Sequence, residues 1–282
     1  LAQISKQGFT YVFDRVTGEP IWPIEERPVA TDTDVPGERP SPTQPFPTRP
    51  APFEYQGVEI DDLVDFTPEI RLMAIDAIEP FRVGPLFTPQ MWAGTIQRPS
   101  TGGGANWSGA AFDPDTGMFY IPSDNRYSVK QYREPRPGED ATLAVLERRG
   151  DGSSTPQMPQ GLPLLKPPYS RMSAVDMNTG EYAWQVPTGE GSRYRNHPRL
   201  RDLNLPPLGG DNGSNGPLLT KTLLFYCLTA GGTNEGPRLV ARDKMTGDIV
   251  GSVDLPAGAI GTPMTYMHEG KQYIALTVGG EV

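Results

Sequence analysis

Lys6 is the first residue of this chain whose type and setting could do chemistry. It stands in SKQGFTYV, beside a turn between two short strand-like runs. An ammonium group on an inner strand is costly in free energy unless an anion or a dipole meets it. Lys6 is therefore a candidate for meeting a bound ligand. A solvated lysine beside a turn remains the simpler interpretation of these residues alone.

A second candidate is the phrase TGGGANWSGAAFD at 101–113. Its three glycines allow the backbone to approach another group closely or to take positive φ angles. Asn106 offers an amide donor and acceptor, and Trp107 offers a flat face with an indole donor. Read by itself, the phrase favours a tight turn with a structural tryptophan packed between two neighbouring sheets. No Walker or GxGxxG pattern follows, which argues against nucleotide binding.

The third glycine-rich loop, LGGDNGSNGPLLTK at 208–221, precedes a strand and contains Asn212, which could contact a ligand or lie in a solvent turn. Other types of site have little support. Cys227 stands inside the apolar run LLFYCLTA, so we expect a buried, inert thiol. Two histidines, His197 and His268, are too few for a multi-histidine metal site or Ser–His catalysis.

A recurring phrase indicates the elements that must position these residues. An aspartate, two variable positions and Thr-Gly recur beside apolar strand-like runs, as a hairpin turn capped by the aspartate does. Its copies are FDRVTGEPIW at 13–22, FDPDTGMFYI at 112–121, VDMNTGEYAW at 175–184 and RDKMTGDIVG at 242–251. Four copies predict a repeat architecture. The four aspartates are turn caps in this interpretation. Trp22 and Trp184, which end two of the phrases, resemble a docking motif in which the tryptophan of one propeller blade packs on the next blade.

The spacing of the repeats predicts an all-β chain that forms about four blades of a β-propeller. Asp113 and Asp176 are 63 residues apart, and Asp176 and Asp243 are 67 apart. A four-stranded blade needs about 40–50 residues, so each interval fits one blade with decorated loops. The interval from Asp14 to Asp113 is 99 residues and contains an insertion.

The insertion covers 23–90 within a single propeller segment, 1–282. Its first half is rich in proline and poor in apolar residues, which favours an extended strap over the propeller surface. A proline-motif docking site is the alternative. Its second half has helical spacing of apolar residues, and Thr67-Pro68 predicts the start of a short surface helix.

Composition limits the partners. The chain has 282 residues, 32 glycines, 32 prolines and a net charge of −9, which argues against nucleic acid and anionic membrane surfaces. The sequence has no apolar run of about 20 residues, so it predicts no membrane-spanning helix. The sequence opens inside a strand-like run and ends as abruptly, so we expect further sequence, or another chain, to complete the ring of blades.

Several separate blocks of the sequence resemble the pyrroloquinoline-quinone (PQQ)-dependent dehydrogenases, above all the membrane-bound glucose dehydrogenase branch. The blocks are SKQGFTYVFDRVTGEPIWPIEERPV, SPTQPFPTRPAPF, DLVDFTPEIR, RVGPLFTPQ, GGGANWSGAAFDPDTGMFYIPS, GPLLTKTLLF and LPAGAIGTPMTYMHEGKQYIALTVGG. The order of these blocks and the residues in them agree with the family, with gaps, from end to end, and the long insertion is shared. Family members form an eight-bladed propeller of roughly twice this length, so the chain resembles its C-terminal half.

The resemblance implies roles for the candidate residues. Lys6 matches the family lysine that reaches the quinone oxygens, and Asn106 and Trp107 match an Asn-Trp pair at the cofactor. Asn212 stands in a loop that approaches the cofactor in relatives, but the sequence of this loop here, DNGSN, departs from the family pattern. The family's catalytic aspartate base and most of its calcium ligands match positions before residue 1, so no metal ligand is assigned in this chain.

The function implied is part of a periplasmic quinoprotein dehydrogenase that oxidises a sugar or alcohol by hydride transfer to PQQ held with Ca²⁺. Electrons would pass to ubiquinone or a cytochrome, and membrane association would come from a region outside this chain. The alternative is a non-catalytic propeller scaffold or binding module of the same repeat superfamily. Such a scaffold has no need of Lys6, the GGGANW phrase or the long insertion.

Overall fold

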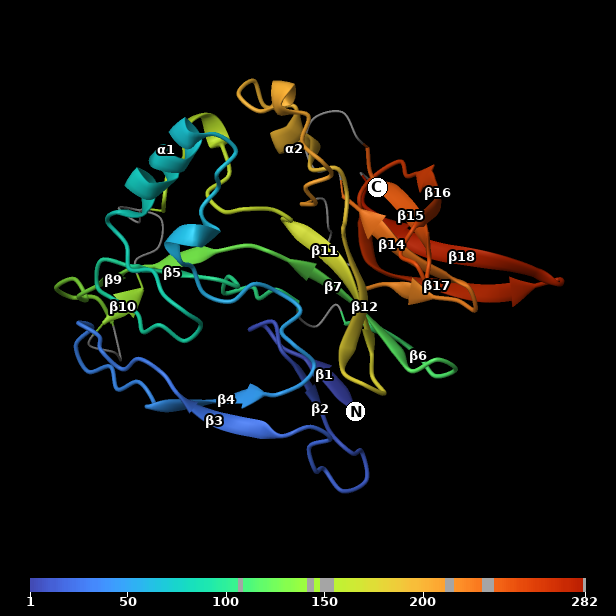
Figure 1. Ribbon diagram of the computed structural model, residues 1–282, viewed down its shortest axis with the longest axis horizontal. Coiled ribbons are helices and arrows are strands. Elements are labelled where there is room, and N and C mark those ends of the chain that lie inside the picture. Colours follow the sequence, from blue (N-terminus) through green and yellow to red (C-terminus); the bar gives the residue numbers. More distant parts are fainter. Residues whose placement is uncertain (106–108, 141–144, 148–154, 211–215, 230–235, 281–282) are drawn as a thin grey trace.

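The computed structural model describes residues 1–105, 109–140, 145–147, 155–210, 216–229 and 236–280. The strands of these residues form two four-stranded and five two-stranded sheets, and every pair of strands is antiparallel. The two larger sheets follow one another in the chain and lie next to each other in Figure 1. Short antiparallel sheets joined by tight turns are what the alternating strand-like runs predict.

The two four-stranded sheets are complete blades, here called the central blade and the following blade. The central blade has the order β12-β11-β7-β6, and the following blade has the order β13-β14-β15-β16. The strands of the central blade are β6 (Ala111–Asp113), β7 (Met118–Asp124), β11 (Ser170–Asp176) and β12 (Glu181–Pro187). Those of the following blade are β13 (Leu218–Leu219), β14 (Leu223–Leu228), β15 (Arg238–Asp243) and β16 (Ile249–Asp254).

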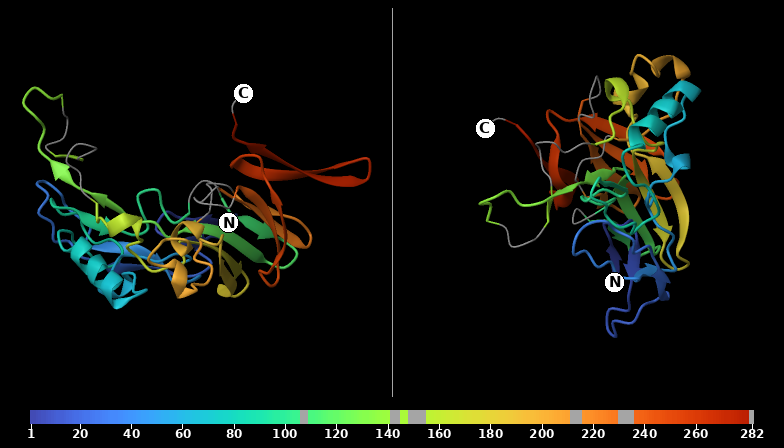
Figure 2. Two further views of the ribbon diagram at one scale, coloured as in Figure 1. Left: turned by 90° about the horizontal axis from the view of Figure 1, so that it is seen from above. Right: turned by 90° about the vertical axis from the view of Figure 1, so that its left-hand side faces the viewer.

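Shorter ribbons lie before and after these blades. They are β1 (Ala2–Ile4) with β2 (Thr10–Val12), β3 (Ile24–Pro28) with β4 (Thr43–Pro47), β5 (Thr95–Gln97) with β8 (Ser128–Lys130), β9 (Tyr132–Arg133) with β10 (Leu146–Glu147), and β17 (Ala259–His268) with β18 (Lys271–Val278). Figure 2 shows the β17–β18 ribbon standing out from the following blade. Ile260 and Met264 on this ribbon are exposed. No sheet of the described residues closes into a ring.

The β-propeller prediction is confirmed as a set of blades, but the assignment of one repeat to each blade was wrong. Asp113 and Asp176 belong to hairpins of the same blade, since β6–β7 and β11–β12 both lie in the central sheet. The 63-residue interval therefore lies within one blade and contains the long connection, 125–169, between β7 and β11. The same phrase suits any tight hairpin, so its spacing does not distinguish two hairpins of one blade from two blades.

All four repeated phrases form the expected turn. The carboxylates of Asp14, Asp113, Asp176 and Asp243 each accept a hydrogen bond from a backbone N–H two residues on. The glycine that ends each phrase has φ between +77° and +79°. The aspartates are thus turn caps, as the sequence predicts.

The last hairpin joins the following blade to the central blade. Trp184 Nε1 and Tyr120 Oη both donate to the Lys244 carbonyl, at 3.2 and 3.1 Å. The Lys244 ammonium in turn donates to Asp113 Oδ2 at 2.5 Å, and both side chains are nearly excluded from solvent. The indole of Trp184 covers Gly247, where a Cβ would lie 2.9 Å from the ring. The tryptophan packs on the next blade, as its position in the repeat predicts.

Gly247→Ala should destabilise the protein by about 2–4 kcal/mol, because alanine would adopt a positive φ and press on the Trp184 ring. Gly18→Ala is a matched control, since Gly18 has the same φ but nothing within 4 Å of its added Cβ. We expect the control to cost only the backbone part, about 1 kcal/mol. Urea unfolding of both variants measures the difference. Equal losses would contradict a tight blade-to-blade contact.

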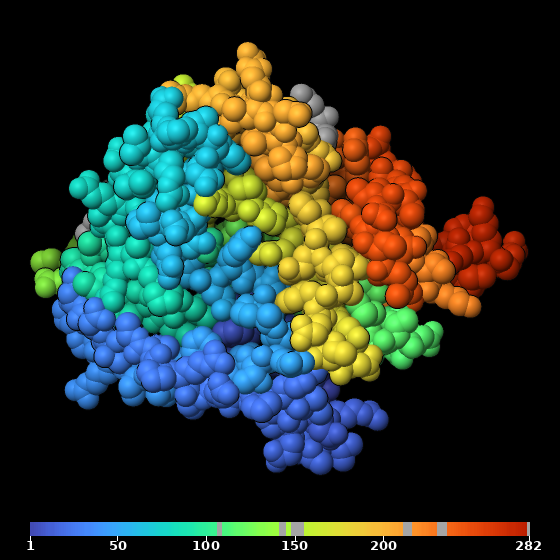
Figure 3. Space-filling model, viewed as in Figure 1, coloured from blue at the N-terminus to red at the C-terminus, as the bar shows by residue number. Residues whose placement is uncertain are grey.

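The insertion contains the expected helix, α1 (Pro68–Ile78), and Thr67 caps it by accepting from Ile70 N–H at 3.2 Å. The helix is more than a surface element, because Ile70, Ala74 and Ile78 are buried with the leucines of 162–165. Figure 3 shows the two segments side by side. The proline-rich first half contains the β3–β4 ribbon instead of a wholly extended strap. Short helices lie at α2 (Ser192–Arg195), η1 (Ile60–Asp62), η2 (Pro159–Gly161) and η3 (Arg201–Leu203).

Candidate functional site

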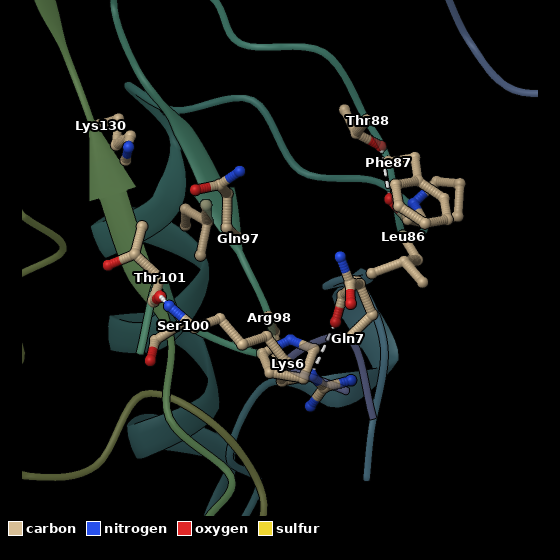
Figure 4. Close-up of a pocket in the computed structure, with 14 residues that line it drawn as sticks. Lys6, Gln7, Leu86, Phe87, Thr88, Gln97, Arg98, Ser100, Thr101 and Lys130 are labelled. Atoms are coloured by element: carbon tan, nitrogen blue, oxygen red, sulfur yellow. Dashed lines mark hydrogen bonds between the residues drawn. The ribbon is translucent and has the colours of Figure 1, made fainter. Parts of the chain in front are cut away.

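Lys6 lies in the tight turn between β1 and β2. The turn is closed by hydrogen bonds from Gly8 N–H to Ser5 O and from Ser5 N–H to Phe9 O. The side chain of Lys6 is exposed, and its ammonium donates to the Thr101 carbonyl at 3.1 Å (Figure 4). An ammonium group has three N–H donors, and among the residues that the structure describes only Thr101 accepts from this one.

The glycine run lies directly against this turn. Gly104 N–H donates to the Lys6 carbonyl at 3.0 Å, and a Cβ added to Gly103 would lie 2.7 Å from Lys6 Cα. The close approach expected of the glycines is therefore an approach to Lys6 itself. Asn106 and Trp107, which follow the run, lie outside the described residues, as does Asn212.

One end of the central blade anchors both glycine-rich loops. Asp124, the last residue of β7, donates its N–H to the Gly104 carbonyl at 2.7 Å. Its cross-strand partner is Ser170, whose hydroxyl accepts from Gly210 N–H at 2.7 Å. The Asp-Thr-Gly hairpins lie at the opposite end, where Asp176 pairs with Met118. Both glycine-rich loops are thus hydrogen-bonded to paired strand ends at the same end of the blade.

A buried carboxylate supports the Lys6 turn from the insertion side. Glu54 is fully buried and binds the Arg171 guanidinium at 2.5 Å and the Ser123 hydroxyl at 2.8 Å. A Cβ at Gly8 or at Gly104 would come within 3.0–3.2 Å of the Glu54 Cβ. Glu54 therefore fills the space under both the turn and the glycine run. The sequence gives no local signal for this role.

Asp124 is the titratable group beside the glycine run. Burial raises its pKa from the usual 3.8 to about 6, and nearby Glu54 adds to the rise. Arg126, 3.5 Å away, opposes it. Its side chain is 24% exposed, so the carboxylate has only limited access to water.

Asp124→Asn should stabilise the protein at neutral pH and not at acid pH. Because the folded pKa lies above the unfolded one, the stability linked to Asp124 is fully present below about pH 4 and is lost as the pH rises through 6. The amide avoids this loss, so we expect a gain on the order of 1–3 kcal/mol at pH 8. Unfolding at pH 4 and pH 8 measures it, with the exposed Asp115→Asn as a control. A gain that is equal at both pH values would refute the buried-carboxylate interpretation.

A pocket of about 340 Å³ opens beside Lys6. Its walls come from the Lys6 turn, the insertion at 85–88, β5 and the residues that follow it, and Lys130 of β8. Figure 4 shows these side chains around one hollow. The pocket brings the candidate lysine together with segments far away in the sequence.

Other features of the described residues concern possible cofactors and partners. No group of three or more His, Cys, Asp or Glu side chains among them could hold a metal ion. No helix in the described part of the chain is both long and apolar enough to cross a membrane. Cys227 is buried, and burial raises the pKa of its thiol to about 11, in agreement with an inert thiol.

Comparison with known proteins identifies the family. Residues 1–274 match the model of the PQQ family, described as the glucose/ethanol/alcohol dehydrogenase β-propeller domain. The chain belongs to this family. The quinoprotein resemblance of the sequence blocks is thereby confirmed.

Relatives within the PQQ family are quinoprotein dehydrogenases. The chain is 30% identical to the quinate/shikimate dehydrogenase (quinone) of Acinetobacter baylyi, over 98% of the chain and 35% of that protein. It is 28% identical to the glycerol dehydrogenase large subunit of Gluconobacter thailandicus, over 98% of the chain and 40% of that protein. The chain thus spans between a third and two fifths of the length of these relatives.

A solved structure of the PQQ family supports the fold. The quinohemoprotein alcohol dehydrogenase from Comamonas testosteroni aligns with 99% of this chain and 31% of its own, with a TM-score of 0.52 and 21% identity. This likeness concerns the arrangement of the blades. It agrees with the antiparallel sheets of the described residues.

Proposed function

We propose that this chain forms part of a PQQ-dependent dehydrogenase that oxidises a sugar or alcohol. The observation that carries the proposal is the contact between Lys6 and the glycine run of the GGGANW phrase. Both belong to a PQQ-family chain. One N–H of the exposed ammonium bonds to Thr101, and its other two N–H groups take no part in that bond. A non-catalytic scaffold has no use for an exposed cation held in this way.

The residues at this end of the central blade fit a flat, tricarboxylated quinone. Lys6 would donate to its carbonyl oxygens, and Gly103 and Gly104, which lack side chains, would leave room close to that ammonium. Asn106, Trp107 and Asn212 are proposed to contact the same group. Bound PQQ supplies an electrophilic ortho-quinone that accepts a hydride.

The chain's own contribution is to bind and to polarise. Donation from Lys6 would polarise a quinone carbonyl and stabilise negative charge on its oxygen. The Glu54–Arg171 pair holds the Lys6 turn and the glycine run in place, so the ammonium stays oriented. We propose that the general base, most Ca²⁺ ligands and the other blades come from sequence outside this chain. Transfer of electrons to ubiquinone or a cytochrome, and a periplasmic location, complete the proposal.

The test is reconstitution of the complete protein. Apoprotein is supplied with PQQ and Ca²⁺, separately and together, and reduction of an artificial dye is measured with glucose, glycerol and quinate. We expect dye reduction only when both PQQ and Ca²⁺ are present. A folded protein that binds no PQQ and reduces no dye with any substrate would instead be a scaffold.

A further inference from the structure

The pocket beside Lys6 has a charge that contrasts with the rest of the chain. Lys6, Arg98 and Lys130 line it, and none of its 14 lining residues is acidic. The chain as a whole carries a net charge of −9. A cationic hollow in an acidic protein concentrates anions and selects against cations.

Two of the three cations already have partners. Arg98 donates to the Gly57 carbonyl at 2.6 Å and pairs with Asp62 at 2.7 Å. Lys6 donates to Thr101 and faces the proposed cofactor. The half-buried Lys130 makes no side-chain hydrogen bond or ion pair with any residue that the structure describes. Lys130 is therefore the cation available to a small anion in this pocket.

Gln97 supplies a second group without a partner. Its Oε1 is buried and accepts no hydrogen bond from the described residues. In the β5–β8 pair, Gln97 lies opposite Ser128 and Thr95 lies opposite Lys130, so Gln97 and Lys130 extend from the same face of the ribbon. A buried acceptor is costly unless a donor reaches it, and rotation of the Gln97 amide into the pocket would let a ligand hydroxyl serve as that donor.

The opposite wall is fixed by a strained aromatic residue. Phe87 has φ of +67°, which is uncommon for a residue with a bulky side chain. Its ring packs edge-on against Phe46 of β4 at 5.6 Å. Backbone strain of this kind is found most often at binding sites. Figure 4 shows this wall, Leu86 to Thr88, across the hollow from Gln97 and Lys130.

We propose that this pocket binds a hydroxylated carboxylate, with Lys130 paired with the carboxylate and Gln97 Oε1 accepting from a hydroxyl. The inference rests on the proposed function, because it makes the ligand the alcohol that is oxidised beside Lys6. A carboxylate of the cofactor has the same chemistry toward Lys130, so the experiment must separate the two sources.

The test is Lys130→Met in the complete, PQQ-loaded protein, with the exposed Lys221→Met as the matched control. Loss of one charge-assisted bond should lower kcat/KM for quinate about 10–100-fold while kcat/KM for the neutral glycerol changes less than about 2-fold. Gln97→Leu should lower kcat/KM for quinate about 10-fold with the charge kept. Calorimetric titration with quinate gives a readout independent of turnover.

The outcomes are distinct. Weaker quinate binding with unchanged PQQ affinity supports the substrate pocket. If Lys130→Met instead raised the Kd for PQQ and affected all substrates equally, Lys130 would pair with a carboxylate of PQQ. The assignment of Lys130 to the substrate would then be wrong. Unchanged quinate and PQQ binding would overturn the proposal. If dye reduction fails, titration of the PQQ-free protein with quinate still measures binding in the pocket. Failure of the dehydrogenase proposal can therefore be told apart from failure of the pocket proposal.

Discussion

Lys6→Met should abolish most PQQ-dependent dye reduction, with kcat falling about 10²–10³-fold. Removal of a single donor to a developing oxyanion has an effect of this size. Among the described residues the exposed side chain makes one hydrogen bond, to Thr101, so folding stability should change by less than about 0.5 kcal/mol. Steady-state kinetics of the complete protein with PQQ and Ca²⁺ measures the loss.

Lys6→Arg distinguishes charge from geometry. Arginine keeps the cation but replaces a compact ammonium by a planar fork, so we expect partial activity between that of wild type and Lys6→Met. Lys221→Met serves as the control for loss of a surface lysine. If Lys6→Met kept wild-type kcat and PQQ affinity, the cofactor role of Lys6 would be wrong.

Lys244→Met should destabilise the protein by about 3–5 kcal/mol, because it leaves the Asp113 carboxylate buried between two blades without its cation. The Lys244 ammonium is also the main cause of the lowered pKa of Asp113, with Thr116 next. This depressed pKa contributes stability that is present above about pH 4 and lost as the pH falls through the lowered value. Urea unfolding at pH 7 measures the effect.

Two further variants test the origin of this loss. Asp113→Asn combined with Lys244→Met removes both charges, so the double variant should be more stable than Lys244→Met alone. Arg238→Gln breaks the exposed Arg238–Asp254 pair, where the side chains are 38% and 86% exposed, and should cost under about 1 kcal/mol. A loss for Lys244→Met as small as that of Arg238→Gln would show that the blades do not depend on the buried pair.

The sequence predicts the features of this chain that are local. The Asp-x-x-Thr-Gly phrase forms its turn from its own side chains, so all four hairpins could be predicted. Thr67-Pro68 predicts the start of α1 for the same reason. Local patterns do not report which strands share a sheet, and the long β7–β11 connection led to the wrong assignment of blades.

Long-range contacts of the candidate site could not be predicted. Glu54 and Arg171 are 117 residues apart, and FEYQG carries no mark of a buried carboxylate. Lys130 and Gln97 also lack a motif, since only the β5–β8 pairing brings them to one face. The family resemblance predicts that Lys6, Asn106 and Trp107 face a common ligand. The described residues show that the glycine run before Asn106 contacts the backbone of Lys6. The cofactor roles of Lys6, Asn106, Trp107 and Asn212 stay predictions.

The central blade separates its two tasks along the length of its strands. The capped hairpins and the Lys244 junction occupy one end, and both glycine-rich loops are hydrogen-bonded to the other, at Asp124 and Ser170. Substitutions at Gly104 or Gly210 therefore lie at the opposite end of the blade from the Lys244 junction. If the loops bind the substrate as we propose, loops grafted from a relative would alter specificity while the capped hairpins at the other end keep their own hydrogen bonds.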